Sequence, residues 1–389
     1  MTQIEKLKNT FLDTFGPSDQ DIHSFFSPSR INIIGEHIDY NGGEVFPCPL
    51  EIGTYGLARK NDDQLLRLKS LNLEAQANIK IQDISYQEDH DWMNYVTGMV
   101  KYIGEAGYQV GGFDLLVYGN IPNGAGLSSS ASLEMLVGMV LSVLYNGGNI
   151  DKKEMALLGQ KTENDFFGLQ TGIMDQFIIA LGQKNHATLI NTNELSYEHV
   201  PFDLADYALV ILNTNKRREL KDSKYNERRS ECNQALAILK EEKTDINYLC
   251  DLGQDDLELL NKIKDPKIKN RALHVIMENV RVKQAVDALN QGDIQKLGQL
   301  LVASNDSLRD LYEVTGPHLD SITKHANSFD ACLGARMTGA GFGGCGIAIV
   351  KKDRIDEFVD HVRVAYKEDT GLDCQFIQSD IGDGVREII

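Results

Sequence analysis

The segment from residue 113 to residue 145 constrains the fold of this chain more than any other. A strand-like run, Phe113–Tyr118, leads into the loop G-N-I-P-N-G-A-G-L-S-S-S, and the apolar residues of a helix follow. Glycines let the backbone approach an anion closely, and a helix start offers unpaired N–H groups with roughly half a positive charge. Strand, loop and helix in this order favour a phosphate site in a fold that mixes helices and strands. A turn that only caps a core helix is the alternative interpretation.

A second polar loop follows another strand-like run. Residues 30–47 read R-I-N-I-I-G-E-H-I-D-Y-N-G-G-E-V-F-P, in which the apolar alternation predicts a half-buried strand and the Asn-Gly-Gly run predicts a tight turn. Five polar side chains lie within six positions between them. That density suits a ligand with many hydroxyl groups, each of which needs a partner once water is excluded. A solvated surface turn is the alternative, and His37 taken alone is more typical of a structural histidine.

The length of 389 residues predicts two domains, because one hydrophobic core seldom grows that large. We place the boundary near residues 195–205, which gives an N-terminal domain of residues 1–200 and a C-terminal domain of residues 201–389. Strand-like runs and amphipathic helical segments alternate in both halves, so the predicted class is α/β (α+β).

Charge and cysteine content exclude several classes of function. The formal net charge of −18 argues against a nucleic-acid partner, whose phosphates need a basic surface. The six cysteines are scattered without a C-x-x-C pair, which favours neither a zinc site nor a disulfide framework. The charged N-terminus lacks the apolar core of a signal peptide, and the longest apolar window, residues 135–145, is short of a membrane span. We therefore expect a cytoplasmic protein with no membrane partner.

A single carboxylate, Asp175, lies in the apolar run G-I-M-D-Q-F-I-I. Burying a carboxylate in such surroundings is costly unless it is paired or hydrogen-bonded. The residues alone leave open a helix cap, a buried salt bridge or a catalytic group.

Three of these segments resemble motifs of the GHMP small-molecule kinase family, in the family's own order. Residues 30–47 resemble its galactokinase signature, residues 122–131 resemble the nucleotide motif P-x-x-x-G-L-S-S-S-A, and G-I-M-D-Q-F is similar to the segment that carries a catalytic aspartate. The loop has no Walker A lysine, which separates it from P-loop NTPases. The glycines of Met337–Gly346 form G-x-G-x-x-G but lead into a strand, which excludes a dinucleotide-binding fold. This segment resembles a further motif of the family, and its contact with ligand stays open.

The resemblance implies a two-domain GHMP kinase fold with the active site in the interdomain cleft. It also implies transfer of the γ-phosphate of ATP to the C1 hydroxyl of α-D-galactose, with Mg²⁺ as cofactor and galactose and ATP as the small-molecule partners of a monomer. The catalytic pair would be Arg30 and Asp175. The sugar-binding residues would be Glu36, His37, Ile38, Asp39 and Tyr225. The ATP-binding residues would be Ser70, Gly124, Ala125, Gly126, Leu127, Ser128, Ser129 and Ser130, and the metal ligands would be Ser130 and Glu163.

Two roles for Asp175 stay open at this point. It can abstract the proton of the sugar hydroxyl as a general base, a contribution of about 10²- to 10⁴-fold. It can also mainly orient the hydroxyl, because a loose phosphoryl-transfer transition state demands little early deprotonation. We favour orientation with late proton acceptance, and charge stabilisation by Arg30. A kinase for another sugar, such as N-acetylgalactosamine, and a non-enzymatic sensor of sugar and ATP are the remaining alternatives.

Overall fold

The first half of the chain is built on a six-stranded sheet. The computed structural model describes residues 2–122, 124–216 and 221–388. In the sheet the strand order is β13-β1-β3-β6-β4-β5, and β4 pairs with β6 in parallel while the other pairs are antiparallel. The strands are β1 (His23–Asn32), β3 (Pro47–Lys60), β4 (Leu65–Ser70), β5 (Gln76–Lys80), β6 (Phe113–Gly119) and β13 (Arg386–Ile388).

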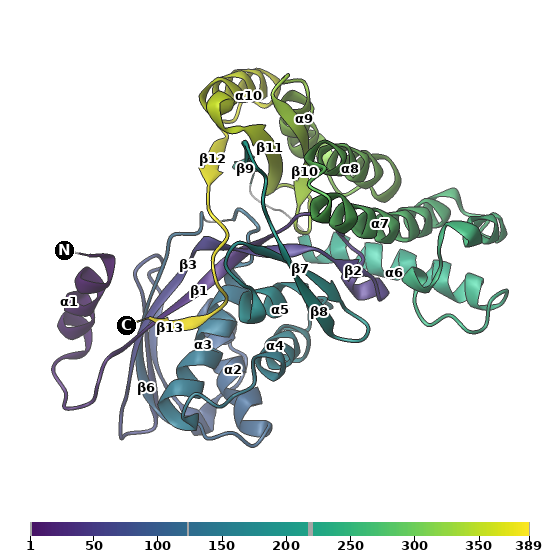
Figure 1. Cartoon of the computed structure of the whole chain (residues 1–389). Coiled ribbons are helices and arrows are strands. Elements are labelled where there is room, and N and C mark those ends of the chain that lie inside the picture. The colour runs from purple at the N-terminus through teal and green to yellow at the C-terminus, as the bar shows by residue number, and fades with distance from the viewer. Residues whose placement is uncertain (1, 123, 217–220, 389) are drawn as a thin grey trace.

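Helices cover both faces of this sheet (Figure 1). Because successive strand residues point to opposite faces, Ala58 and Leu115 belong to the main core, whereas Leu57 and Leu116 pack against Leu7 of the first helix. That helix is α1 (Gln3–Phe15), and the helices over the main core are α2 (Met93–Glu105), α3 (Ser129–Asn146), α4 (Lys152–Lys161) and α5 (Met174–Leu181). The predicted strand, loop and helix of residues 113–145 are thus confirmed as β6 and α3.

The second half contains a four-stranded antiparallel sheet against which α8, α9 and α10 pack, while α6 and α7 lie farther out (Figure 1). Its strands, in the order β10-β11-β9-β12, are β9 (Tyr207–Asn213), β10 (Cys332–Thr338), β11 (Cys345–Lys351) and β12 (Gln375–Gln378). The helices are α6 (Lys221–Lys240), α7 (Pro266–Asn290), α8 (Ile294–Ser307), α9 (Gly316–Asn327) and α10 (Ile355–Thr370). A small third sheet pairs β2 (Glu44–Val45), from the loop after β1, with β7 (His186–Asn191), which pairs in turn with β8 (Ser196–Pro201).

The end of the chain departs from the predicted division at residue 200. The segment after β12 returns to the first sheet, where β13 pairs with β1 and Ile381 bridges to Leu50 (Figure 1). Val385 is completely buried there. The C-terminal range of 201–389 is therefore too long at its end, because β1 needs a partner on its outer edge and the last strand of the chain supplies it.

Side chains from the two halves join where β1 and β10 end. Arg336 is fully buried, and its Nη1 donates to the carbonyl oxygens of Asn32 (3.2 Å) and Ile33 (2.7 Å). The hydroxyl of Thr338 donates to the carbonyl of Asn32 at 3.0 Å. These bonds fix the two sheets against each other directly beside the polar loop that begins at Gly35. Within the described residues, no helix combines the length and the apolar character of a membrane span.

Candidate active site

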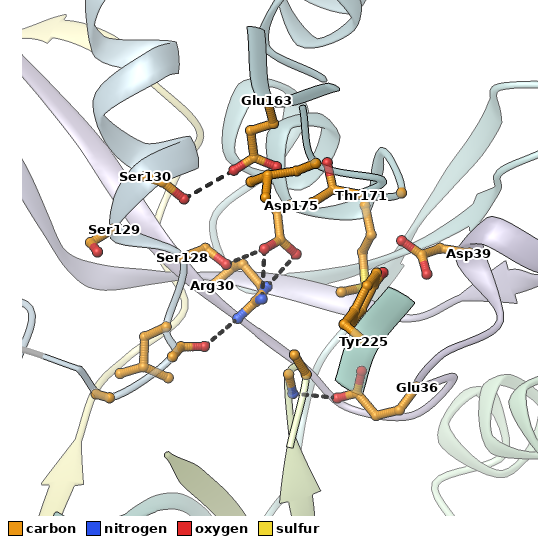
Figure 2. A pocket seen from close by; sticks show the side chains of 18 of the residues that line it. Arg30, Glu36, Asp39, Ser128, Ser129, Ser130, Glu163, Thr171, Asp175 and Tyr225 are labelled. Carbon is orange, nitrogen blue, oxygen red and sulfur yellow. Dashed lines mark hydrogen bonds and ion pairs between the residues drawn. The ribbon is translucent and has the colours of Figure 1, made fainter. Parts of the chain in front are cut away.

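A cleft of about 630 Å³ lies between the two halves, within the usual size range of small-molecule sites. It is lined from the first half by β1, the loop after it, the Gly- and Ser-rich loop and the start of α5, and from the second half by α6 and the loop between β10 and β11. Figure 2 shows the polar side chains that converge in it. Of the predicted site residues, the cleft is lined by Arg30, Glu36, His37, Asp39, Gly124, Ala125, Gly126, Leu127, Ser128, Ser129, Ser130, Glu163, Asp175 and Tyr225.

An irregularity in the pairing of β1 with β3 lies directly beside Arg30, which lines the cleft. Pro28 pairs with Gly53 and Arg30 with Pro49, so one residue of β1 there faces three residues of β3. The extra residues on β3 interrupt the ladder locally and change the twist of the pair. Arg30 is only 4% exposed, and its guanidinium points to Asp175 in Figure 2.

Arg30 and Asp175 form a two-pronged ion pair in the middle of the cleft. Nε of Arg30 donates to Oδ1 of Asp175 and Nη2 donates to Oδ2, both at 2.7 Å. Burial acts to lower the pKa of Arg30, but the charge and hydrogen bonds of Asp175 outweigh it, so the pKa of the guanidinium is raised. The side chain of Asp175 stays 30% exposed, against 5% for Arg30, so a ligand can reach the carboxylate while the arginine holds it.

The Gly- and Ser-rich loop is attached to the same pair. Nη1 of Arg30 donates to the carbonyl of Gly126 at 3.1 Å, and the hydroxyl of Ser128 donates to Oδ2 of Asp175. Gly124, Gly126 and Ser128 all have positive φ, at 70°, 74° and 60°, which curls the backbone just before α3 begins. Because the hydroxyl of Ser128 turns to Asp175 and does not cap α3, the first N–H groups of that helix are left for a ligand.

Ser130 and Glu163 lie side by side at the far end of this loop. The hydroxyl of Ser130 donates to Oε1 of Glu163 at 3.1 Å (Figure 2). Glu163 belongs to a single π-helical turn, Thr162–Phe166, that ends α4, and such turns are frequent at functional sites. The side chain of Ser129 is drawn apart from this pair in Figure 2 and the residue is exposed.

The Ser130–Glu163 pair fits Mg²⁺. Two hard oxygen donors beside a phosphate loop match an ion that takes one or two protein ligands and completes its shell with phosphates and water. Across residues 2–122, 124–216 and 221–388 there is no cluster of three or more His, Cys, Asp or Glu that would form a metal cage made by protein alone.

Glu36 and Asp39 present carboxylates from the polar loop. Oε1 of Glu36 accepts from the N–H of Gly339 at 2.8 Å and lies 3.2 Å from Nη2 of Arg336, while Oε2 accepts from Nδ2 of Asn32 at 3.0 Å. Glu36 therefore also joins the two halves, a role that the sequence did not predict.

Asp39 has an unusual electrostatic setting. Burial raises the pKa of Asp39 to about 7, and the carboxylates of Asp175 and Glu36 add to the shift. Gly172 lies so close that a Cβ built on it would come 1.7 Å from Oδ2 of Asp39. A side chain at this position would therefore force the carboxylate of Asp39 or the backbone to move, and the motif search around Asp175 did not single this glycine out.

His37 is held by the protein on both ring nitrogens. Nε2–H donates to the carbonyl of Ala340 at 3.2 Å, so Nδ1 is the acceptor for the hydroxyl of Tyr40 at 2.8 Å. Burial, reinforced by His274, lowers the pKa of His37 to about 3, so the ring is neutral. Tyr40 in turn accepts from Tyr312 at 2.8 Å. The His37 ring therefore stabilises the wall of the cleft through its hydrogen bonds to Tyr40 and Ala340.

Tyr225 of α6 lines the cleft from the second half. Its ring centroid is 5.6 Å from that of His37 and 5.3 Å from that of Tyr40. Burial and the neighbouring Asp39 raise the pKa of Tyr225 well above its usual value, so it stays a neutral hydroxyl. The basic segment around it, residues 216–229, is described except for residues 217–220.

Two predicted site residues do not line this cleft. Ile38 is fully buried and packs against the backbone of Gly43, because an aliphatic side chain between polar neighbours turns to the core. Ser70 is 4% exposed at the end of β4, where its hydroxyl accepts from the N–H groups of Asn72 and Leu73 at 3.1 and 3.2 Å. In this structure Ser70 thus stabilises a turn, and contact with nucleotide is a prediction only.

The structure adds residues that motif matching missed, among them Tyr95 of α2 and Thr171, which line the cleft. Gly339 and Ala340 also line it, and they belong to the Gly-rich segment Met337–Gly346, whose contact with ligand stays open. Helical periodicity gives no hint that Tyr95 faces a ligand. The role of Arg336 could have been suspected from the sequence. A single arginine in a strand-like run beside a Gly-rich motif is costly to bury unless it has a partner.

Comparisons with known proteins match this geometry. A model of the galactokinase galactose-binding signature matches residues 9–60, and models of the GHMP kinases N terminal domain and the GHMP kinases C terminal match residues 94–183 and 285–368. The galactokinase of Clostridium tetani is 50% identical over 386 residues, which cover 99% of this chain and 98% of the relative. The galactokinase of Enterococcus faecalis is 46% identical over 388 residues, 99% of each chain.

Solved structures agree with these relatives. The crystal structure of Lactococcus lactis galactokinase complexed with galactose superimposes with a TM-score of 0.96 at 43% identity, covering 100% of both chains. The mevalonate kinase of Methanococcus jannaschii superimposes with a TM-score of 0.66 at 19% identity, covering 94% of this chain and 99% of that one, which shows a shared fold. With family models in both halves and full-length relatives near half identity, this chain belongs to the galactokinase family of the GHMP kinases.

Proposed function

We propose that the cleft transfers the γ-phosphoryl group of ATP to the C1 hydroxyl of α-D-galactose. The observation that carries this proposal is the Arg30–Asp175 pair, which lies between a hydroxyl-binding loop on one side and a phosphate-binding loop on the other. A catalyst of phosphoryl transfer needs mainly to position two substrates in line and to stabilise charge, and this arrangement supplies both.

The sugar would lie against residues 36–39 and Tyr225. The carboxylates of Glu36 and Asp39 accept hydrogen bonds from hydroxyl groups, and the phenol of Tyr225 can donate or accept. These groups are buried or half-buried, so a hydroxyl that meets no partner would be penalised, which is the physical basis for choosing among sugars.

The triphosphate would lie along residues 124–130 at the start of α3. The positive φ angles curl this backbone, and the uncapped N–H groups of the helix favour anions. Ser130 and Glu163 would hold Mg²⁺, which when bound supplies positive charge against the phosphate oxygens.

Asp175 would orient the C1 hydroxyl and accept its proton late in the reaction. Two hydrogen bonds from Arg30 and one from Ser128 stabilise the ionised carboxylate, which weakens it as an early base but fixes its direction. Arg30 would then face the transferring phosphoryl group, where a fixed positive charge stabilises the transition state.

We also propose that the protein is a monomer in the cytoplasm. Among the described residues no disulfide bond joins any of the six cysteines, as suits a reducing compartment. Size-exclusion chromatography with light scattering would test the first point, since a mass well above 43.3 kDa would contradict it.

The test of the function is ADP release measured with galactose, glucose, N-acetylgalactosamine and mevalonate as acceptors. Rapid release with galactose alone, with the product identified by NMR as phosphorylated at C1, is the expected result. Preference for N-acetylgalactosamine would reassign the acceptor. The absence of ADP release with every sugar, from protein that binds galactose and ATP, would favour a sensor.

A further inference from the structure

The backbone of the sugar-side loop is held by α7, a helix of the other half of the molecule. The N–H of Gly35 donates to Oε1 of Glu278 at 3.0 Å, and Nε2–H of His274 donates to the carbonyl of Glu36 at 3.2 Å. At the far end of the loop the N–H of Glu44 donates to Oδ1 of Asn279 at 2.9 Å. Helix α7 therefore contacts the loop at its beginning and at its end.

Glu278 is built to accept hydrogen bonds as an anion. It is completely buried, and besides Gly35 it accepts from the hydroxyl of Ser304 at 2.6 Å and from Nε of Arg281 at 2.7 Å. Burial alone would raise the pKa of Glu278, but Arg281 and its cationic neighbours lower the pKa to about 2. Hydrogen bonds to a charged acceptor are about twice as strong as neutral ones, so the bond from the N–H of Gly35 to Glu278 is a strong one.

His274 acts one helical turn earlier as a directed donor. Because Nε2–H donates to a carbonyl, Nδ1 is left to accept from the hydroxyl of Ser307 at 2.8 Å. Burial lowers the pKa of His274 to about 4, so the ring is neutral with a fixed tautomer.

The loop needs such support because its conformation is unfavourable. Gly35 has φ of 105° and His37 has φ of 63°, a region that a non-glycine residue occupies only when its surroundings compensate. A Cβ on Gly35 would lie 3.0 Å from Cγ2 of Val282, so α7 is pressed against the loop. Glycine takes a positive φ without strain, so His37 is the strained position, and the bond from His274 to the carbonyl of Glu36 holds the peptide directly before it.

We propose that Glu278, assisted by His274, is the positioning residue that sets the affinity for the sugar. It does not line the cleft, and it acts by holding the Gly35–Glu36 peptide so that the carboxylates of Glu36 and Asp39 face the sugar. The proposal rests on the proposed function, because it assigns residues 36–39 to sugar binding. Its consequence is that recognition in the first half depends on a helix of the second half.

The test compares Glu278→Gln with wild type in steady-state kinetics and in calorimetric titration with galactose. The amide keeps the shape but loses the charge and turns an NH₂ group toward Arg281 or Gly35. We expect the KM and the Kd for galactose to rise about ten-fold or more, because small misplacements of a binding group have effects of this size. We expect kcat and the KM for ATP to stay within about two-fold, which is the pattern of lost uniform binding.

Asp114→Asn is the matched control. Asp114 is equally buried and pairs with Arg59 (2.8 Å) and Arg67 (2.7 Å), but it lies on β6 and does not line the cleft. Loss of a buried carboxylate should lower the thermal midpoint of both variants, whereas only Glu278→Gln should change galactose binding. A Glu278→Gln protein with wild-type KM and Kd for galactose would overturn the proposal.

His274→Gln decides the question if Glu278→Gln does not fold. This variant removes the bond to the carbonyl of Glu36 and leaves the charge of Glu278 in place. A rise in the galactose KM that is smaller than the ten-fold rise expected for Glu278→Gln supports the proposal, and an unchanged KM refutes it. The wild-type protein in the same assay separates this outcome from a failure of the proposed function, which would show as no phosphorylation of galactose by wild type.

Discussion

At the scale of single residues, Asp175 fits two of the roles that the sequence left open. The pattern around Asp175 allowed a buried salt bridge or a catalytic carboxylate, and the structure places an ion pair with Arg30 at a position that a ligand can reach. The sequence could predict that Asp175 has a partner, because one acid in an apolar run is costly to bury alone. It could not predict which residue the partner is, since Arg30 lies 145 residues earlier in the chain.

Substitution of the pair should abolish turnover without unfolding the protein. Asp175→Asn keeps the size of the side chain but removes the charge that orients and finally accepts the proton, so kcat should fall by about 10²- to 10⁴-fold. Arg30→Ala should lower kcat at least as much, because it also leaves Asp175 without its partner. Single-turnover kinetics with a thermal melt of each variant measures both properties, and near-normal kcat in either one would remove that residue from the mechanism.

The setting of Asp39 predicts a pH dependence of sugar binding. The pKa of this carboxyl is raised to about 7, so in the free protein it is mainly protonated below pH 7 and ionised above it. Because the ionised form accepts from sugar hydroxyls at both oxygens, kcat/KM for galactose should fall as the pH drops below about 7. Glu36→Gln removes one of the negative charges that raise this pKa, so the inflection in its pH profile should move to lower pH. A profile that is flat from about pH 5.5 to about pH 8, on either side of that pKa, would contradict this assignment.

At the scale of elements, the sequence could predict motifs formed by neighbouring residues but not the hydrogen bonds between distant elements. Strand β6, its loop and α3 follow one another in the chain, so periodicity and glycine spacing could predict them. The hold of α7 on Gly35 joins residues 243 positions apart, and no local pattern records it. The register shift between β1 and β3 beside Arg30 and the inward turn of Ile38 were missed, because the same sequence also suits a regular strand and a ligand-facing loop.

The close contact between Gly172 and Asp39 gives a prediction at this scale. In Gly172→Ala the new Cβ would lie 1.7 Å from Oδ2 of Asp39, so either the carboxylate or the segment before α5 must move. The galactose KM should rise by at least about ten-fold. Gly253→Ala is the control, because a Cβ there meets nothing within 4 Å. If Gly172→Ala binds galactose like the control, Asp39 is not a sugar ligand in the position described.

His274 predicts how the stability of the α7 contact depends on pH. Its pKa is lowered from 6.5 to about 4 on folding, so between those values the unfolded chain binds a proton that the folded protein does not. This contribution to stability is therefore complete above about pH 6.5 and is lost as the pH falls toward 4. The difference in unfolding free energy between wild type and His274→Gln should shrink from pH 7 to pH 5 in urea titrations. A difference that is constant over this range would show that the ring is not held neutral.

At the scale of the whole molecule, length predicted two domains and the alternation of elements predicted a mixed class of helices and strands. The family resemblance implied the cleft between the domains, which sequence periodicity alone could not predict. The return of the last strand to the first sheet was not predicted, because three residues, Arg386–Ile388, give too short a pattern to assign a partner. The halves are therefore joined by the chain twice, as well as by Arg336 and the contacts of α7.

The most direct test of the account is a crystal structure of the protein with galactose and a non-hydrolysable ATP analogue with Mg²⁺. We expect the C1 hydroxyl within hydrogen-bond distance of Asp175, the phosphates along residues 124–130, and the guanidinium of Arg30 between the two ligands. A sugar bound away from residues 36–39, or phosphates that leave the start of α3 empty, would contradict the central claim that this pair joins the two substrates.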